Sequence, residues 1–126
     1  MDILDILRQD YGRFPEAQTF EIYAENVFFK DPLNEFRGVD RYKKMIGFLG
    51  GLFKNIDLDL HQIHRNDTTI RTDWTLKMTC PLPWQPRLSI SGYSLLEVNE
   101  QDLIISHIDY WNDAPLKVLK QVFKFS

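Results

Sequence analysis

Apolar residues recur at helical spacing in two stretches near the start of the chain. Asp2 is a typical N-cap, and the apolar residues after it predict a first helix over residues 3–11. Pro15 suits the first turn of a second helix, which we expect to run to Asn26. A short strand over residues 27–30 should follow. The apolar face of the second helix comprises Ala17, Phe20, Tyr23 and Ala24.

The longest helical stripe begins after a turn that we predict over residues 32–38. Apolar positions at i, i+3, i+4, i+7, i+10 and i+11 predict a helix over residues 42–53. Its apolar face comprises Tyr42, Met45, Ile46, Leu49, Leu52 and Phe53. Asp113 and Pro115 indicate the start of a terminal helix. Its apolar face should comprise Leu116, Leu119 and Phe123.

Between the long helix and the terminal helix the period changes to two, which is typical of strands with one buried and one wet face. Gly92 lies in the middle of one of these strands, a usual place for a bend or bulge in a curved sheet. Three prolines exclude residues 80–86 from a central strand, and residues 99–102 form a hairpin turn. Four strands are predicted, over residues 56–64, 70–78, 88–98 and 103–111.

This order of elements has no βαβ alternation and no repeat, so it predicts an α+β fold with helices on one face of an antiparallel sheet. At 126 residues the chain should form a single domain over residues 1–126. A sheet covered on one side and bent at Gly92 will curl, which predicts a pocket between the sheet and the helices.

Composition excludes several classes of function. The apolar fraction of 44% is that of a folded chain, and a net charge of −3 with scattered Lys and Arg argues against nucleic acid as a partner. The longest apolar run, residues 46–53, falls far short of the roughly 20 residues that span a bilayer. The acidic start does not resemble a signal peptide, so we expect a cytoplasmic protein. Cys80 is the only cysteine, which excludes an internal disulfide.

Three runs of residues resemble a known superfamily over essentially the whole chain. They are residues 23–32 (YAENVFFKDP), residues 36–38 (FRG) before the long helix, and residues 107–111 (HIDYW). These landmarks are similar to the nuclear transport factor 2-like superfamily, which includes ketosteroid isomerase, scytalone dehydratase and the SnoaL-like cyclases. The runs over residues 31–38, 71–76 and 106–111 are similar to a cyanobacterial and plastid group of that superfamily with no assigned function. The resemblance implies a cone-shaped, cystatin-like curved sheet wrapped around the N-terminal helices.

Asp31 falls where the resemblance places the general base of ketosteroid isomerase. A carboxylate in an apolar funnel has a raised pKa, which suits a base. The alternative is that Asp31, which precedes a proline, hydrogen-bonds backbone amides in a turn. The isomerase's two oxyanion donors are not matched, because Leu7 and Ser94 occupy their positions. Tyr11 takes the place of the first donor only after a shift of the alignment.

His107 and Asp109 share one face of the last strand, and the resemblance turns that face toward the funnel. A His–Asp pair can orient an imidazole as a proton shuttle, so both are candidate catalytic residues beside Asp31. The alternative is a hydrogen-bonded structural pair. His61 and His64 are three apart on a strand, which predicts opposite faces and no shared metal. A metal site of His64, His107 and Asp109 has no supporting spacing, and we expect neither metal nor cofactor.

Flat apolar side chains should line the funnel and favour a hydrophobic, ring-containing ligand. Trp84 is held on the proline-rich loop, where it could close the mouth of the funnel. Core packing is the alternative role for each aromatic residue. The candidate ligand-binding residues are Tyr23, Trp74, Met78, Trp84, Ser94 and Trp111.

The opposite face of the last two strands is apolar as well. An apolar face that no helix covers usually marks an interface, which predicts a homodimer formed sheet against sheet. The alternative is that the C-terminal helix covers this face within one chain. The face should comprise Tyr93, Leu95, Ile104, Ile108 and Tyr110.

Two functions are consistent with these patterns. The first is a non-catalytic domain that binds a small hydrophobic molecule or serves as an assembly module. The second is a cofactor-independent isomerase, dehydratase or cyclase that uses Asp31 or the His107–Asp109 pair as general acid–base. The unmatched oxyanion donors favour the first.

Overall fold

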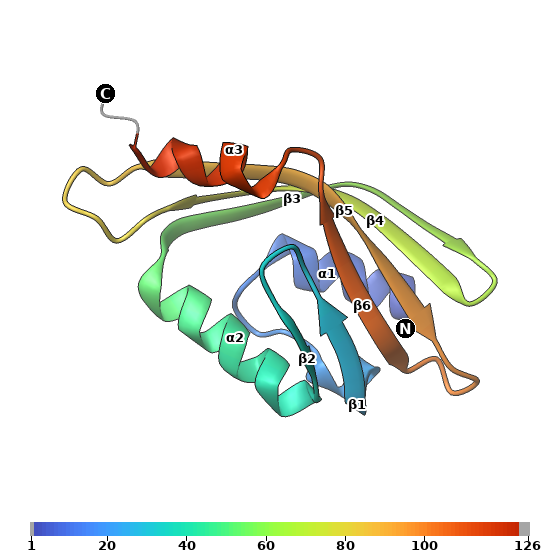
Figure 1. Ribbon diagram of the computed structural model, residues 1–126. Coiled ribbons are helices and arrows are strands. Elements are labelled where there is room, and N and C mark those ends of the chain that lie inside the picture. Colours follow the sequence, from blue (N-terminus) through green and yellow to red (C-terminus); the bar gives the residue numbers. More distant parts are fainter. Residues whose placement is uncertain (1, 124–126) are drawn as a thin grey trace.

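The computed structural model describes residues 2–123, which form helices and one six-stranded sheet (Figure 1). Two short 3₁₀ helices, Phe20–Ile22 and Lys120–Phe123, complete the described elements. None of the helices in this part of the chain is long and apolar enough to cross a membrane. In chain order the main elements are α1 (Ile3–Gly12), β1 (Tyr23–Lys30), β2 (Glu35–Arg37), α2 (Val39–Leu52), β3 (Lys54–Asn66), β4 (Thr69–Thr79), β5 (Arg87–Val98), β6 (Ile104–Trp111) and α3 (Pro115–Leu119).

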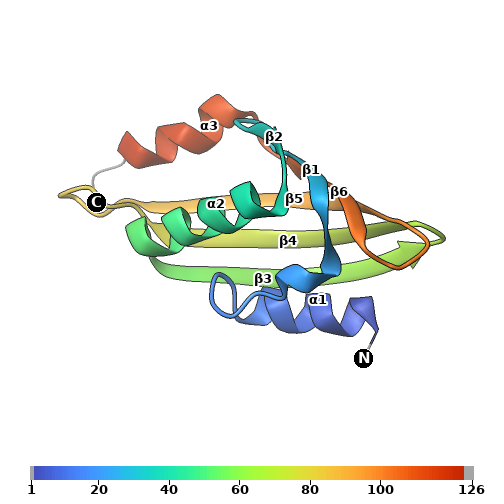
Figure 2. The same ribbon diagram turned by 90° about the horizontal axis from the view of Figure 1, so that it is seen from below.

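The sheet has the strand order β2-β1-β6-β5-β4-β3, and all neighbours are antiparallel except the parallel pair β1 and β6. Helices α1 and α2 lie against the same face of the curved sheet (Figures 1 and 2). We call this the inner face and the opposite one the outer face. The predicted α+β fold with a curved sheet is therefore confirmed, with one parallel pair added.

At Gly92 strands β5 and β6 approach closely, and no bulge interrupts the register there. Gly92 pairs in register with Trp74 of β4 and Trp111 of β6. A Cβ atom at position 92 would lie only 2.0 Å from the carbonyl oxygen of Tyr110. Only glycine lets β5 and β6 come this close.

The predicted second helix over residues 15–26 is wrong. Residues 13–19 form an irregular loop that contains a cis peptide bond between Phe14 and Pro15, and β1 already begins at Tyr23. Tyr23 pairs with Ile104 of β6, so strand pairing overrides the local helical spacing. The predicted turn over residues 32–38 likewise contains a strand, β2, which pairs with the end of β1.

Two bulges reverse the alternation that the sequence suggested. In β3 the register shifts between Leu60 and Gln62. His61 hydrogen-bonds the Thr75 side chain, and His64 pairs with Arg71. Both histidines therefore lie on the outer face. The prediction of opposite faces is wrong. In β6 the register shifts beside Ile104, which is fully buried in the inner core and is not part of the outer face.

The C-terminal helix packs on the inner side through residues other than those we predicted. Val118 is buried against Trp74 and Ile90, and Val122 packs on the same cluster. The predicted apolar stripe is instead exposed, at 68% for Leu116, 40% for Leu119 and 69% for Phe123. The alternative that this helix covers the outer face is therefore wrong.

Candidate functional site

A cavity of about 450 Å³ lies between the inner face of the sheet and the helices. Its walls are mainly apolar and aromatic, and they come from every layer of the fold. Trp74, Met78 and Ile90 form part of the sheet side, while Ile46 and Leu49 of α2 lie opposite. A concave, mostly apolar site with a few polar groups is the usual form of a small-molecule pocket.

One end of this cavity carries a chain of hydrogen bonds across three neighbouring strands. The Trp74 indole N–H donates to Ser94 Oγ at 2.8 Å, and the Ser94 hydroxyl donates to Asp109 Oδ1 at 2.5 Å. His107 Nε2 lies 2.8 Å from the same Oδ1 atom. Register places these groups together, because Ser94 pairs with Asp109 and His107 is two residues before it on the same face. The Asp109 carboxylate is thus the centre of the polar end.

His107 is held by aromatic rings as well as by Asp109. Its ring stacks on Tyr23 at 6.2 Å between centroids and contacts the rings of Phe29 and Tyr42 at 5.0 and 5.7 Å. The Nδ1 atom is buried and has no hydrogen-bond partner among the described residues. A proton on Nε2, donated to Asp109, therefore leaves Nδ1 as an acceptor, which is the tautomer that avoids a buried unpaired N–H.

Three tyrosine hydroxyls surround this end of the cavity. Removal from water raises the pKa of Tyr11 above its ordinary range, despite a 2.9 Å hydrogen bond to Thr72, and the negative charge of Asp109 raises it further. Burial also raises the pKa of Tyr42 and of Tyr23, with smaller contributions from Asp109. These phenols remain protonated and able to donate hydrogen bonds at neutral pH.

Asp31 occupies the edge of the cavity as a turn residue. Its Oδ1 atom accepts from the backbone N–H groups of Leu33 and Asn34 at 2.8 and 2.7 Å, and the Asn34 amide contacts both carboxylate oxygens at 3.2 Å. The carboxylate is therefore engaged in an Asx-type turn, the alternative that the sequence left open. Among residues 2–123, no hydrogen bond or ion pair joins Asp31 to His107 or Asp109.

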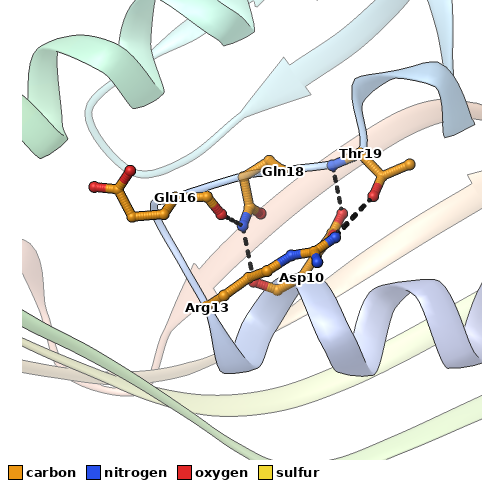
Figure 3. Close-up of polar contacts among 5 residues, drawn as sticks. All are labelled: Asp10, Arg13, Glu16, Gln18 and Thr19. Atoms are coloured by element: carbon orange, nitrogen blue, oxygen red, sulfur yellow. Dashed lines mark hydrogen bonds and ion pairs between the residues drawn. The ribbon is translucent and has the colours of Figure 1, made fainter.

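Asp10 is a buried carboxylate that the sequence analysis did not single out. It is only 3% exposed and accepts from the Thr19 backbone N–H, the Thr19 hydroxyl and Arg13, each at 2.9 Å (Figure 3). The Gln18 side-chain amide donates to the backbone carbonyl of Asp10 at 2.8 Å. These contacts tie the loop over residues 13–19 to α1. Since Phe14 and Gln18 line the cavity, Asp10 fixes one of its walls.

The six candidate ligand-binding residues are not all at the cavity. Trp84 is 39% exposed and donates its indole N–H to the Val122 carbonyl at 2.6 Å, so it holds the C-terminal segment and does not line the cavity. Among residues 2–123, no three His, Cys, Asp or Glu residues are grouped so as to hold a metal ion. The residues that do line the cavity are Tyr23, Trp74, Met78, Ser94 and Trp111.

A family model described as "Uncharacterized conserved protein (DUF2358)" matches residues 1–107, most of the chain. The chain belongs to this family. The match includes His107 and ends before Asp109, the carboxylate at the centre of the polar end. No curated protein matches the chain significantly.

Solved structures show that this DUF2358 chain has the nuclear transport factor 2-like fold that the sequence runs implied. A hypothetical protein with a ketosteroid isomerase-like fold from Catenulispora acidiphila, in complex with trimethylamine, is 13% identical, with a TM-score of 0.75 over 95% of this chain and 91% of that one. A putative isomerase from Bacillus subtilis is 18% identical, with a TM-score of 0.72 over 97% and 94%. An LEH-like epoxide hydrolase from M. tuberculosis is 12% identical, with a TM-score of 0.72 over 95% and 86%. At these identities the likeness concerns the fold alone.

Proposed function

We propose that this DUF2358 protein binds a small, largely apolar, ring-containing molecule in its inner cavity. The observation that carries the proposal is the combination of a 450 Å³ space, apolar and aromatic walls, and one cluster of polar groups at Asp109. Burial of apolar ligand surface supplies the affinity, and the polar cluster fixes the orientation.

A saturable titration with N-phenyl-1-naphthylamine tests this proposal, because this uncharged aromatic probe becomes fluorescent in apolar surroundings. We expect one probe to bind per chain, since the cavity is the apolar space with a built polar end. Fluorescence that rises linearly without saturation, or only after heating past the unfolding transition, would count against a preformed pocket.

A second candidate is a cofactor-independent isomerase, dehydratase or cyclase in which the His107–Asp109 pair acts as general acid–base. The 2.8 Å contact of the pair at the edge of an apolar space favours it, whereas Asp31 is engaged in its turn. Deuterium exchange at the α-carbon of 2-tetralone in D₂O distinguishes the two candidates. Exchange that is faster than in buffer alone, and that is lost in the Asp109→Asn variant, would favour the enzyme.

We further propose a homodimer that pairs two outer faces. Support comes from the stacked rings of Tyr93 and Tyr110, 4.9 Å apart, and from the exposure of Ile105 and Tyr110, 41% and 38%. We expect a dimer in sedimentation velocity, a monomer for Leu95→Glu, and an unchanged dimer for Leu116→Glu, which alters an exposed leucine of α3. A monomeric wild type would contradict this.

A further inference from the structure

Carboxylates, and no lysine or arginine, are among the described residues that line the cavity. Its described lining includes three carboxylates, Asp10, Asp31 and Asp109, and neither lysine nor arginine. Arg13 neutralises Asp10 at 2.9 Å, and the Asp31 carboxylate accepts only uncharged donors. The space therefore carries a negative potential, which favours a cation and opposes an anion.

Two acceptor atoms at the polar end have no hydrogen-bond partner among the described residues. Asp109 Oδ1 takes the donors of both Ser94 and His107, whereas Oδ2 has no hydrogen-bond partner among residues 2–123. The His107 side chain is only 8% exposed, and its Nδ1 atom likewise has no hydrogen-bond partner among the described residues. Because a carboxylate oxygen accepts about two hydrogen bonds, this end calls for a donor from the ligand.

His107 offers a nitrogen at this end that is unpaired among the described residues. A second ring proton would lie on Nδ1, which is buried without an acceptor among the described residues. With Nε2 at 2.8 Å from Asp109 Oδ1, the free Nδ1 atom can accept a hydrogen bond from a ligand.

Aromatic faces around this end suit a positive charge. Tyr11, Tyr23, Phe29 and Tyr42 all line the cavity, and aromatic faces attract cations most strongly where water is excluded. Beyond the effect of burial, the negative charge of Asp109 raises the pKa of Tyr11 and of Tyr42 at this end.

We propose that the cavity selects a protonated organic amine with a small ring-containing body, and that the ammonium group binds Asp109. This inference rests on the proposed function, because it specifies the class of molecule that the same cavity takes. The ammonium donates to Oδ2, the ring body lies along the apolar wall, and the charge pair offsets the desolvation of both ions. A carboxylate ligand of the same body is repelled.

Three compounds with one body and different head groups test this: 2-phenylethylamine, 2-phenylethanol and phenylacetate. In isothermal titration at pH 7 we expect the amine to bind at least about tenfold more tightly than the alcohol, and phenylacetate to bind most weakly. Asp109→Asn should reduce the amine's affinity about tenfold and leave that of the alcohol nearly unchanged. Asp59→Asn, which removes an exposed carboxylate of the outer face, is the matched control and should change neither.

Equal affinity of the wild-type protein for the three compounds, or tighter binding of phenylacetate, would by itself overturn the amine assignment. An amine affinity that Asp109→Asn leaves intact would overturn it as well. Binding of N-phenyl-1-naphthylamine with no binding of the amine refutes this inference and leaves the proposed function standing. Absence of binding by the probe and all three compounds refutes both.

Discussion

Gly92→Ala adds a single methyl group, and we expect it to destabilise the protein more than the addition of a methyl group at any other position. The new Cβ atom would lie 2.0 Å from the Tyr110 carbonyl oxygen, and the contact is with backbone, so no side chain can rotate away. Strands β5 and β6 must separate, which disturbs the pairing of Tyr93 with Tyr110 and of Gly92 with Trp111. We expect the free energy of unfolding to fall by about 3–5 kcal/mol.

Urea denaturation measures this change, and Gly47→Ala is the matched control. Gly47 lies on the exposed side of α2, and a Cβ atom there meets nothing within 4 Å. Alanine should stabilise that helix by about 0.5–1 kcal/mol. If Gly92→Ala were as stable as wild type, β5 and β6 would not approach each other as described.

Asp10→Ala is expected to have the second largest effect. It removes the acceptor of the Thr19 backbone N–H, the Thr19 hydroxyl and Arg13, and it leaves an amide without its partner at a site that is 3% exposed. The expected loss is about 2–3 kcal/mol, since an unpaired buried donor costs its full desolvation. The loop over residues 13–19 should also become accessible, so trypsin should cleave after Arg13 faster than in wild type.

The same helix provides the control for this variant. Asp5 pairs with Arg8 at the same i, i+3 spacing, but its side chain is 54% exposed. Asp5→Ala should therefore change the free energy of unfolding by less than about 0.5 kcal/mol and leave the rate of cleavage at Arg13 unchanged. Equal effects of the two substitutions would show that burial of Asp10 is unimportant.

The parts of the fold that follow local periodicity were predictable from the sequence. The period of two marks β3, β4, β5 and β6 to within two residues at each end, and the long apolar stripe marks α2. The register of the neighbouring strands β5 and β6 then brings Ser94, His107 and Asp109 together on one face. Side chains on strands with a clear alternation are therefore placed by sequence.

The parts that depend on distant contacts were not predictable. Residues 13–22 carry helical spacing, but Asp10 binds Thr19 and Tyr23 pairs with Ile104, eighty-one positions later in the chain. A single extra residue at His61, and another beside Ile104, reverses which face the neighbouring side chains occupy. Spacing carries no signal for a bulge, because the bulge is fixed by the partner strand.

Ligand binding by this protein requires a hollow, apolar interior that a molecule can enter. The most direct measurement is the binding of N-phenyl-1-naphthylamine to two variants of adjacent residues on β4. Met78 is 5% exposed and lines the cavity, whereas Lys77 is exposed on the outer face. Met78→Trp should fill the space and abolish saturable binding, while Lys77→Trp should bind the probe as wild type does. Undiminished binding to a folded Met78→Trp variant would refute the proposed pocket, because the probe would then lie outside the cavity.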